Sequence, residues 1–168
     1  MRKIHLVAVV AGLVSAACLV PAVAAASTSS SYTASGIELA ATSTQGAFAG
    51  RATGSGGDTA LWKAVVVHQD LSTGCLATSS GCPIDQGGSF SLVNNQLSSV
   101  TGSFTGGAVK LASQAPGCGI QVFDVDGQIS TTQGTGTFDV VLTHFRTSLF
   151  GSCVTVFATV SGGVSFGP

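Results

Sequence analysis

Apolar and polar residues alternate in short runs along most of this chain, and glycine, serine or threonine separates the runs. The clearest runs are residues 61–69 (LWKAVVVHQ) and 136–146 (GTFDVVLTHFR). Runs rich in β-branched and aromatic residues, bounded by turn-forming residues, are typical of strands. After residue 26 no stretch keeps a helical period, because glycine and β-branched residues recur every few positions. The pattern predicts an all-β domain.

Weaker runs of the same kind predict further strands at residues 36–41, 47–53, 89–93, 100–105, 108–112, 120–129, 154–160 and 164–166. Eight to ten short strands suit one small antiparallel β-barrel, with a β-sandwich as the alternative. We favour the barrel because closure removes exposed strand edges, which otherwise need charged residues to protect them. The predicted strands contain few such residues, chiefly Lys63, Lys110 and Asp139.

One local pattern, Gly-x-Phe, occurs four times, at Phe48, Phe90, Phe104 and Phe138. Residues two apart in a strand share a face, so each phenylalanine lies on the same side as its glycine. The glycine leaves room for a neighbouring aromatic ring or permits a sharp bend. We interpret the pattern as strand-entry glycines with core phenylalanines, and a stacking surface for a ligand is the alternative.

The first 26 residues have the order of a secretory signal peptide. A basic start at Arg2 and Lys3 precedes an apolar run over residues 4–20, and small residues at 22–26 follow Pro21. We expect cleavage near Ala24 or Ala26 and a secreted, extracellular product with no membrane span. The alternatives are a membrane anchor, for which the run is near the lower length limit, and lipidation at Cys18, which Ser15 disfavours.

The expected organisation is therefore a cleaved segment at 1–26, a flexible lead at 27–35 and a single all-β domain at 36–168. Without the segment, four cations and seven acids leave a formal charge of about −3. So few cations cannot neutralise a phosphate backbone, which argues against nucleic-acid binding. An outer-membrane barrel is also disfavoured, because one tryptophan and one tyrosine leave little for aromatic girdles.

Four cysteines remain after cleavage, and they can pair in three ways. Export favours structural disulfides. We predict Cys75–Cys82, which closes a polar loop between two strands, and Cys118–Cys153, which ties together the starts of the strands at 120 and 154. No C-x-x-C and no Cys/His spacing typical of zinc occurs, so neither a redox site nor a metal site is expected.

Two histidines each end an inward-facing apolar row. Trp62, Ala64 and Val66 precede His68 at two-residue spacing, and Phe138, Val140 and Leu142 precede His144 in the same way. Arg146 continues the second row. If the two strands run in the same direction or are suitably offset, both imidazoles reach one mouth of the barrel. The usual role of such a histidine is to cap the core and bond to a loop carbonyl. The functional alternative is a ligand site formed by Trp62, His68, His144 and Arg146, followed by catalysis or metal binding through the two histidines.

Signatures of common enzymes are missing from the sequence: it has no G-x-S-x-G, no H-E-x-x-H and no Walker-type glycine loop. Asp124 and Asp126 share a face, but we interpret them as a solvent-facing pair. No cofactor or metal is implied. We expect a secreted, non-catalytic barrel that binds a small apolar or polar molecule or a surface partner, or that serves as an envelope protein. The alternative is a secreted hydrolase or isomerase that uses His68 or His144 as its acid–base group.

Overall fold

Residues 29–168 are described by a computed structural model, in which every strand is antiparallel to its neighbours. The signal-like segment, with Cys18, lies outside the described residues. The elements follow one another as β1 (Ser30–Ala41), β2 (Gln45–Gly54), β3 (Thr59–Val67), the 3-10 turns η1 (Leu71–Thr73) and η2 (Cys75–Ala77), β4 (Cys82–Pro83), β5 (Ser89–Asn94), β6 (Ser99–Gln114), β7 (Gln121–Thr131), β8 (Gly134–Leu149) and β9 (Ser152–Gly167).

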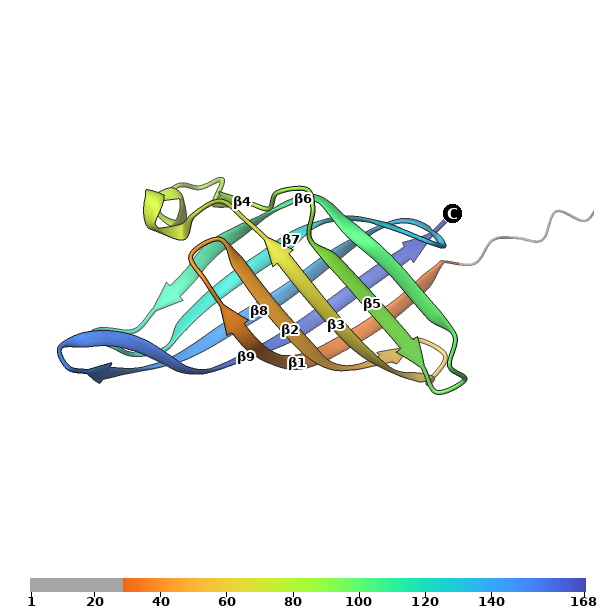
Figure 1. Cartoon of the computed structure of the whole chain (residues 1–168), viewed down its shortest axis with the longest axis horizontal. Coiled ribbons are helices and arrows are strands. Elements are labelled where there is room, and N and C mark those ends of the chain that lie inside the picture. Colours follow the sequence, from red (N-terminus) through yellow and green to blue (C-terminus); the bar gives the residue numbers. More distant parts are fainter. Residues whose placement is uncertain (1–28) are drawn as a thin grey trace, which may run out of the picture.

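Eight of these strands form a closed barrel, and the short β4 is the extra strand (Figure 1). β1 and β9 close the ring through a ladder that runs from Ser30 opposite Phe166 to Ile37 opposite Thr159. β5 and β4 pair with the same edge of β6: β5 pairs with its first part, up to Ser103, and β4 pairs further along, at Ala108 and Val109. The predicted all-β barrel is confirmed. Closure leaves the ring without free strand edges, so the ring does not need the charged residues that would otherwise protect such edges.

The strands differ from the predicted ones in two respects. β1 begins at Ser30, so most of the segment expected as a flexible lead is strand. Tyr32 and Ala34 face inward there, while the small polar residues between them face outward. The predicted strand pairs 100–105 with 108–112 and 154–160 with 164–166 are single strands, β6 and β9, because two glycines continue the strand in each case.

Glycines on one strand make space for phenylalanines on the next. Phe90 lies opposite Gly102, and a Cβ at that glycine would be 2.6 Å from the ring. Phe138 lies opposite Gly127, with a corresponding distance of 2.9 Å. Phe138 also meets Phe104 edge-on, with ring centroids 5.2 Å apart. Rings that cover glycines on adjacent strands fill a narrow barrel without overpacking it.

The β8–β9 hairpin extends past the end of β7. Pairing between β7 and β8 stops where Gln121 meets His144, while β8 and β9 remain paired as far as Leu149 and Ser152. The Cys118–Cys153 disulfide, with Cα atoms 5.2 Å apart, fastens this extension to the loop between β6 and β7. Both predicted disulfides are confirmed, and Cys75–Cys82 closes the loop after η1. No helix within residues 29–168 is long and apolar enough to cross a membrane.

Candidate functional site

The barrel surrounds a cavity of about 180 Å³ that is largely apolar. Aromatic and aliphatic side chains form most of its wall, among them Trp62, Phe90, Phe123, Phe138, Leu142 and Val160. Apart from Lys63 on β3, the exposed lining residues are Ala41, Thr42 and Gln45, which all lie at the β1–β2 turn, so the cavity opens at that end. An apolar cavity of about 150 Å³ is large enough to hold benzene. The barrel therefore has room for a molecule of about one aromatic ring.

Four titratable residues line the cavity, and three of them, Glu38, His68 and His144, are at least partly buried. The fourth, Lys63, is exposed and lies between the inward-facing Trp62 and Ala64 of β3. β1, β3 and β8 run parallel to one another along the barrel. An odd number of antiparallel strands, one or three, separates each of them from the next around the ring. Each of the three less exposed side chains lies toward the C-terminal end of its strand or just after it. The strand directions therefore place all three at the open end of the barrel.

Glu38 and His144 meet across β9. His144 pairs with Ala158, and the β1–β9 register places Glu38 on the other side of that alanine. The small Ala158 side chain leaves room above it, and Nε2 of His144 lies 3.1 Å from Oε2 of Glu38. The two side chains are only 15% and 9% exposed. The contact has the length of an ion pair but not the alignment of a hydrogen bond, and Nε2 has no hydrogen-bond partner among the described residues.

The remaining contacts of His144 fix its ring. Nδ1 lies 3.5 Å from Oγ1 of Thr155, and the ring meets Phe123 edge-on at 5.1 Å between centroids. On the other side, a β-bulge at Leu39 follows Glu38 where β1 pairs with β2. Bulges commonly re-aim a side chain at a strand end. Both groups are therefore held in place, and each has hydrogen-bonding capacity left for a third group.

His68 is buried and uses one ring nitrogen within its own segment. Nδ1 lies 2.9 Å from the carbonyl oxygen of Gln69. A carbonyl can only accept, so Nδ1 carries the hydrogen, and in the neutral ring Nε2 is an acceptor. This is the carbonyl-bonded arrangement that we gave as the usual role of such a histidine. His68 lies more than hydrogen-bond distance from Glu38, so the two histidines share the cavity but only His144 contacts the carboxylate.

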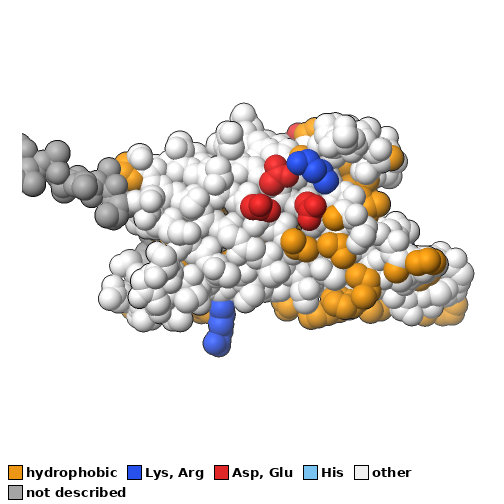
Figure 2. Space-filling view, turned by 180° about the vertical axis from the view of Figure 1, so that it is seen from behind, with side chains coloured by type: hydrophobic (Ala, Val, Ile, Leu, Met, Phe, Trp, Pro, Cys, Tyr) orange, Lys and Arg blue, Asp and Glu red, His pale blue; other side chains and the backbone are white. Residues whose placement is uncertain are grey.

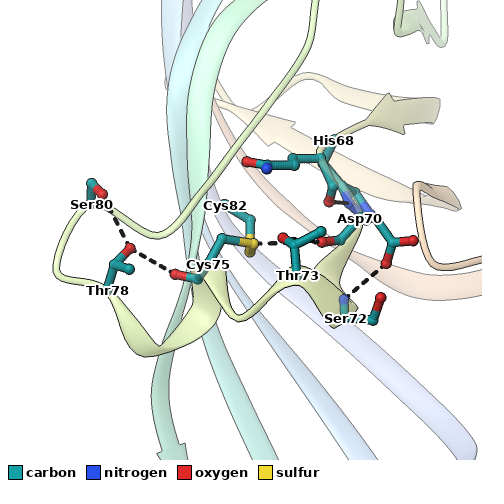
Figure 3. The surroundings of a disulfide bond; sticks show 9 residues. His68, Asp70, Ser72, Thr73, Cys75, Thr78, Ser80 and Cys82 are labelled. Carbon is teal, nitrogen blue, oxygen red and sulfur yellow. Dashed lines mark hydrogen bonds between the residues drawn. A yellow bond between two sulfur atoms is a disulfide. The ribbon is translucent and has the colours of Figure 1, made fainter.

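The segment after His68 closes one side of the barrel end (Figure 3). Oδ1 of Asp70 accepts a hydrogen bond of 2.9 Å from the backbone N–H of Ser72 and caps η1. This hydrogen bond is the main reason why the pKa of Asp70 lies below its usual value. The Cys75–Cys82 disulfide then ties η2 to β4, and Cys82 is completely buried. The turn so fixed carries Leu71, which lines the cavity.

Trp62 lines the cavity with its ring, because its one polar atom is already bonded. Nε1 donates to the backbone oxygens of Ser35 at 3.2 Å and Arg51 at 3.0 Å. The indole thus crosses β2 to reach β1. It offers a bound molecule an apolar surface and no hydrogen bond.

Arg146 is not among the residues that line the cavity. It follows His144 on the inward side of β8, within the extension that passes the end of β7. Its Nη1 is buried without a hydrogen-bond partner in the described part of the chain. The structure thus brings together three of the four candidate ligand-site residues, Trp62, His68 and His144.

Sequence reasoning missed Glu38, the only glutamate of the chain. Its signal was present: Tyr32, Ala34, Gly36 and Glu38 form an inward row at two-residue spacing that ends in a titratable group, as the rows of the two histidines do. The first residues of the row lie in the segment that the sequence predicts as a flexible lead, so the row is not evident from the sequence alone.

The carboxylates of β7 face the outer surface instead. Nζ of Lys110 lies 2.7 Å from Oδ1 of Asp126, and this contact raises the pKa of Lys110. The acidic side chains beside one cation in Figure 2 belong to this outer face of the barrel. Within residues 29–168, no three His, Cys, Asp or Glu side chains are grouped in a way that would hold a metal ion.

Comparison of the chain with protein-family models, with curated proteins and with solved structures found no match.

Proposed function

We propose that this protein is exported and binds a small, largely apolar molecule inside its barrel. The observation that carries the proposal is the cavity of about 180 Å³, whose wall is mostly aromatic and aliphatic and whose polar groups gather at the open end. Ligand sites are commonly apolar pockets with a few well-placed polar groups that fix orientation.

Two features support export. The N-terminal segment has the order of a signal peptide, and all four cysteines of residues 29–168 are paired. Disulfides persist in oxidising compartments outside the cytosol. N-terminal sequencing of protein recovered from culture medium is expected to start directly after Ala24 or Ala26. Recovery of the uncleaved chain in the cell alone would contradict export.

The binding experiment uses toluene as an apolar probe of suitable size. Saturable binding of toluene is measured by NMR titration of the secreted protein, together with native mass spectrometry for any retained molecule. Ala64→Leu projects extra atoms into the cavity, whereas Ala49→Leu places the same side chain on the outer face of β2. We expect the first variant to weaken toluene binding at least tenfold and the second to leave it unchanged.

A solid interior in solution would give neither saturable toluene binding nor a retained molecule, and that result would overturn the proposal. Equal binding by the two alanine variants would place the probe elsewhere on the surface and would also contradict it.

The contact between Glu38 and His144 favours one second candidate, a secreted acid–base enzyme. A carboxylate beside an imidazole, both facing an apolar cavity, is a suitable arrangement for moving a proton on a bound substrate. Under this alternative, Glu38→Gln and His144→Phe abolish a turnover found by substrate screening but retain binding. Full activity in both variants would exclude this pair from catalysis.

A further inference from the structure

The polar groups at the open end restrict the chemistry of a bound molecule. The Glu38 side chain is nine-tenths buried and lines the cavity, and its contact with His144 is not aligned as a hydrogen bond. Nε2 of His144 is buried beside it and has no hydrogen-bond partner among the described residues. Buried polar groups are nearly always hydrogen-bonded, and an unsatisfied one destabilises the protein. Both groups therefore call for a third group in the cavity.

The distance between them shows what that group must be able to do. The two groups are not aligned for a hydrogen bond with each other, but two acceptor atoms 3.1 Å apart repel, so one of the two groups carries a hydrogen. The pair then presents one donor and at least one free acceptor to the cavity. An ammonium group has no acceptor for the donor, and a carboxylate has no hydrogen for the acceptor. A hydroxyl group can both donate and accept.

We infer that the molecule bound in the barrel carries a hydroxyl group that lies between Glu38 and His144, with its apolar part against Trp62 and Phe123. This inference rests on the proposed function. The hydroxyl donates to the Glu38 carboxylate and accepts from Nε2 of His144. The bound molecule needs no ionic group of its own beside Glu38, and the apolar wall beyond Glu38 excludes such a group.

Four one-ring probes of similar size test the inference: toluene, phenol, benzoate and benzylamine. We expect phenol to bind at least tenfold more tightly than toluene, since two hydrogen bonds to buried groups exceed the roughly 1.4 kcal/mol that a factor of ten represents. Benzoate and benzylamine are expected to bind more weakly than phenol. The preference for phenol, measured as the ratio of the phenol and toluene affinities of the same variant, is expected to disappear in His144→Phe and in Glu38→Leu.

The outcomes separate the two claims. If neither toluene nor phenol binds, the proposed function fails. If both bind equally, or if benzoate or benzylamine binds best, the cavity is a ligand site but the hydroxyl inference is wrong. The wild-type protein provides a check that needs no variant: phenol, but not toluene, is expected to shift the ring resonances of His144 more than those of His68, and equal shifts would contradict the inference.

A different observation concerns the outer surface. Apolar side chains on the adjacent strands β1, β9 and β8 form an exposed patch, which we call the hairpin patch: Ile37, Leu39, Phe145, Leu149, Phe150, Val156 and Phe157. Phe150 is 98% exposed at the turn of the extended hairpin. In Figure 2 hydrophobic side chains gather at the end of the molecule where this hairpin projects.

The hairpin that carries the patch also has unpaired edges. In the described structure, β8 has no strand beside it on the β7 side after His144, and β9 has none on the β1 side before Thr159. Within residues 145–157 only Arg146 is charged, and there is no proline. Natural sheets protect exposed edges with such residues, and an unprotected apolar edge is a template for pairing with another chain. Lipid hydrocarbon cannot satisfy edge N–H and C=O groups, so we exclude it as the main partner.

We propose that the hairpin patch binds the same patch of a second copy of this chain. The patch contains no charge that would need an opposite charge on a different partner, and two uncharged apolar faces related by a two-fold axis do not repel. Because one aromatic side chain carries about 150–250 Å² of surface, the exposed fractions of the patch amount to several hundred Å². That area is on the order of the roughly 800 Å² per partner of a standard interface.

Sedimentation equilibrium over a dilution series tests this proposal with two matched pairs of variants. Leu39 in the patch and Leu61 outside it are both 63% exposed, and Phe150 and Leu97 both have a positive φ, of 50° and 62°. We expect a dimer that Leu39→Ser and Phe150→Asn weaken at least tenfold and that Leu61→Ser and Leu97→Asn do not change. A monomer at every concentration would overturn the proposal. So would a dimer that all four variants retain, or a monomer that floats with phosphatidylcholine vesicles in a Phe150-dependent manner.

Discussion

The indole ring of Trp62 lies against the backbone of Gly36, two strands away. A Cβ atom at Gly36 would be 2.7 Å from Cζ2 of the ring, and it would overlap the carbonyl oxygen of Ala49. Gly50, on the strand between them, pairs with both residues. Two glycines without side chains thus let the ring approach the wall closely and reach two backbone oxygens. The width of the cavity at this level depends on them.

Replacement of Gly36 by alanine is therefore expected to displace the ring. Overpacking of a well-packed interior costs about 1–3 kcal/mol of unfolding free energy. We expect Gly36→Ala to lower the urea midpoint accordingly and to change the fluorescence of Trp62, the only tryptophan of the chain. Trp62→Phe keeps an aromatic ring but removes the N–H donor. Its stability therefore shows the effect of losing the two hydrogen bonds without displacement of the ring by a side chain at Gly36. Unchanged stability and fluorescence in Gly36→Ala would show that the ring is not confined as described.

Two adjacent glycines in β9 are expected to respond to alanine in opposite ways. A Cβ at Gly162 would overlap the carbonyl oxygen of Asp139 and lie 2.5 Å from Cα of Val140, whereas a Cβ at Gly163 would find only the oxygen of Tyr32, at 3.9 Å. Gly163→Ala restricts the unfolded chain without strain and is expected to stabilise the protein by about 0.4–1 kcal/mol. Gly162→Ala is expected to destabilise it by about 1–3 kcal/mol. Thermal unfolding of both variants tests the contrast, and equal shifts would contradict it.

The barrel itself was predictable because the evidence for it is local. Valine-rich runs between turn-forming residues, the absence of helical periods and the small number of charged strand residues all point to a closed sheet. One cysteine pair around a short polar loop and one at two strand starts predict the disulfides. The strand lengths were not predictable in the same way. The sequence predicts a break at Gly106 and Gly107, but their pairing with Gln128 and Gly127 of β7 keeps them within β6.

The candidate site was predictable only in part, for a related reason. Two-residue spacing placed Trp62, His68 and His144 inward, and the strand directions brought the histidines to one end. The contact between Glu38 and His144 depends on the β1–β9 register that closes the ring, and no local pattern encodes that register. Arg146 illustrates the opposite case: its row continues correctly along β8, but the barrel wall ends before the row does.

The two disulfides are expected to contribute unequally to stability. By loop entropy, Cys75–Cys82 contributes about 2.5 kcal/mol and Cys118–Cys153, which closes a longer loop, about 3.8 kcal/mol. We expect Cys118→Ala/Cys153→Ala to lower the unfolding free energy more than Cys75→Ala/Cys82→Ala. The second double variant is expected to disturb His68 and Leu71 at the cavity entrance and so to weaken toluene binding, which the first does not. Guanidinium unfolding measures the loss of stability, and the NMR titration measures toluene binding. A larger loss of stability in Cys75→Ala/Cys82→Ala, or weaker toluene binding in Cys118→Ala/Cys153→Ala alone, would contradict these expectations.

Tyr32 is expected to make the stability depend on alkaline pH. Burial, together with the charge and hydrogen bond of Asp58 at 3.3 Å, raises the pKa of this phenol above its usual value of 10.0. The folded state therefore holds the proton more tightly than the unfolded state. The corresponding stability is complete below pH 10.0 and is lost as the pH rises through the folded-state pKa. Because Tyr32 is the only tyrosine, its ultraviolet absorbance reports the titration directly. Asp58→Asn is expected to lower the pH midpoint of the Tyr32 titration. Tyr32→Phe is expected to abolish both the absorbance signal and the associated loss of stability. A titration midpoint at or below pH 10.0 in the wild-type protein would contradict the burial of the ring against Phe166.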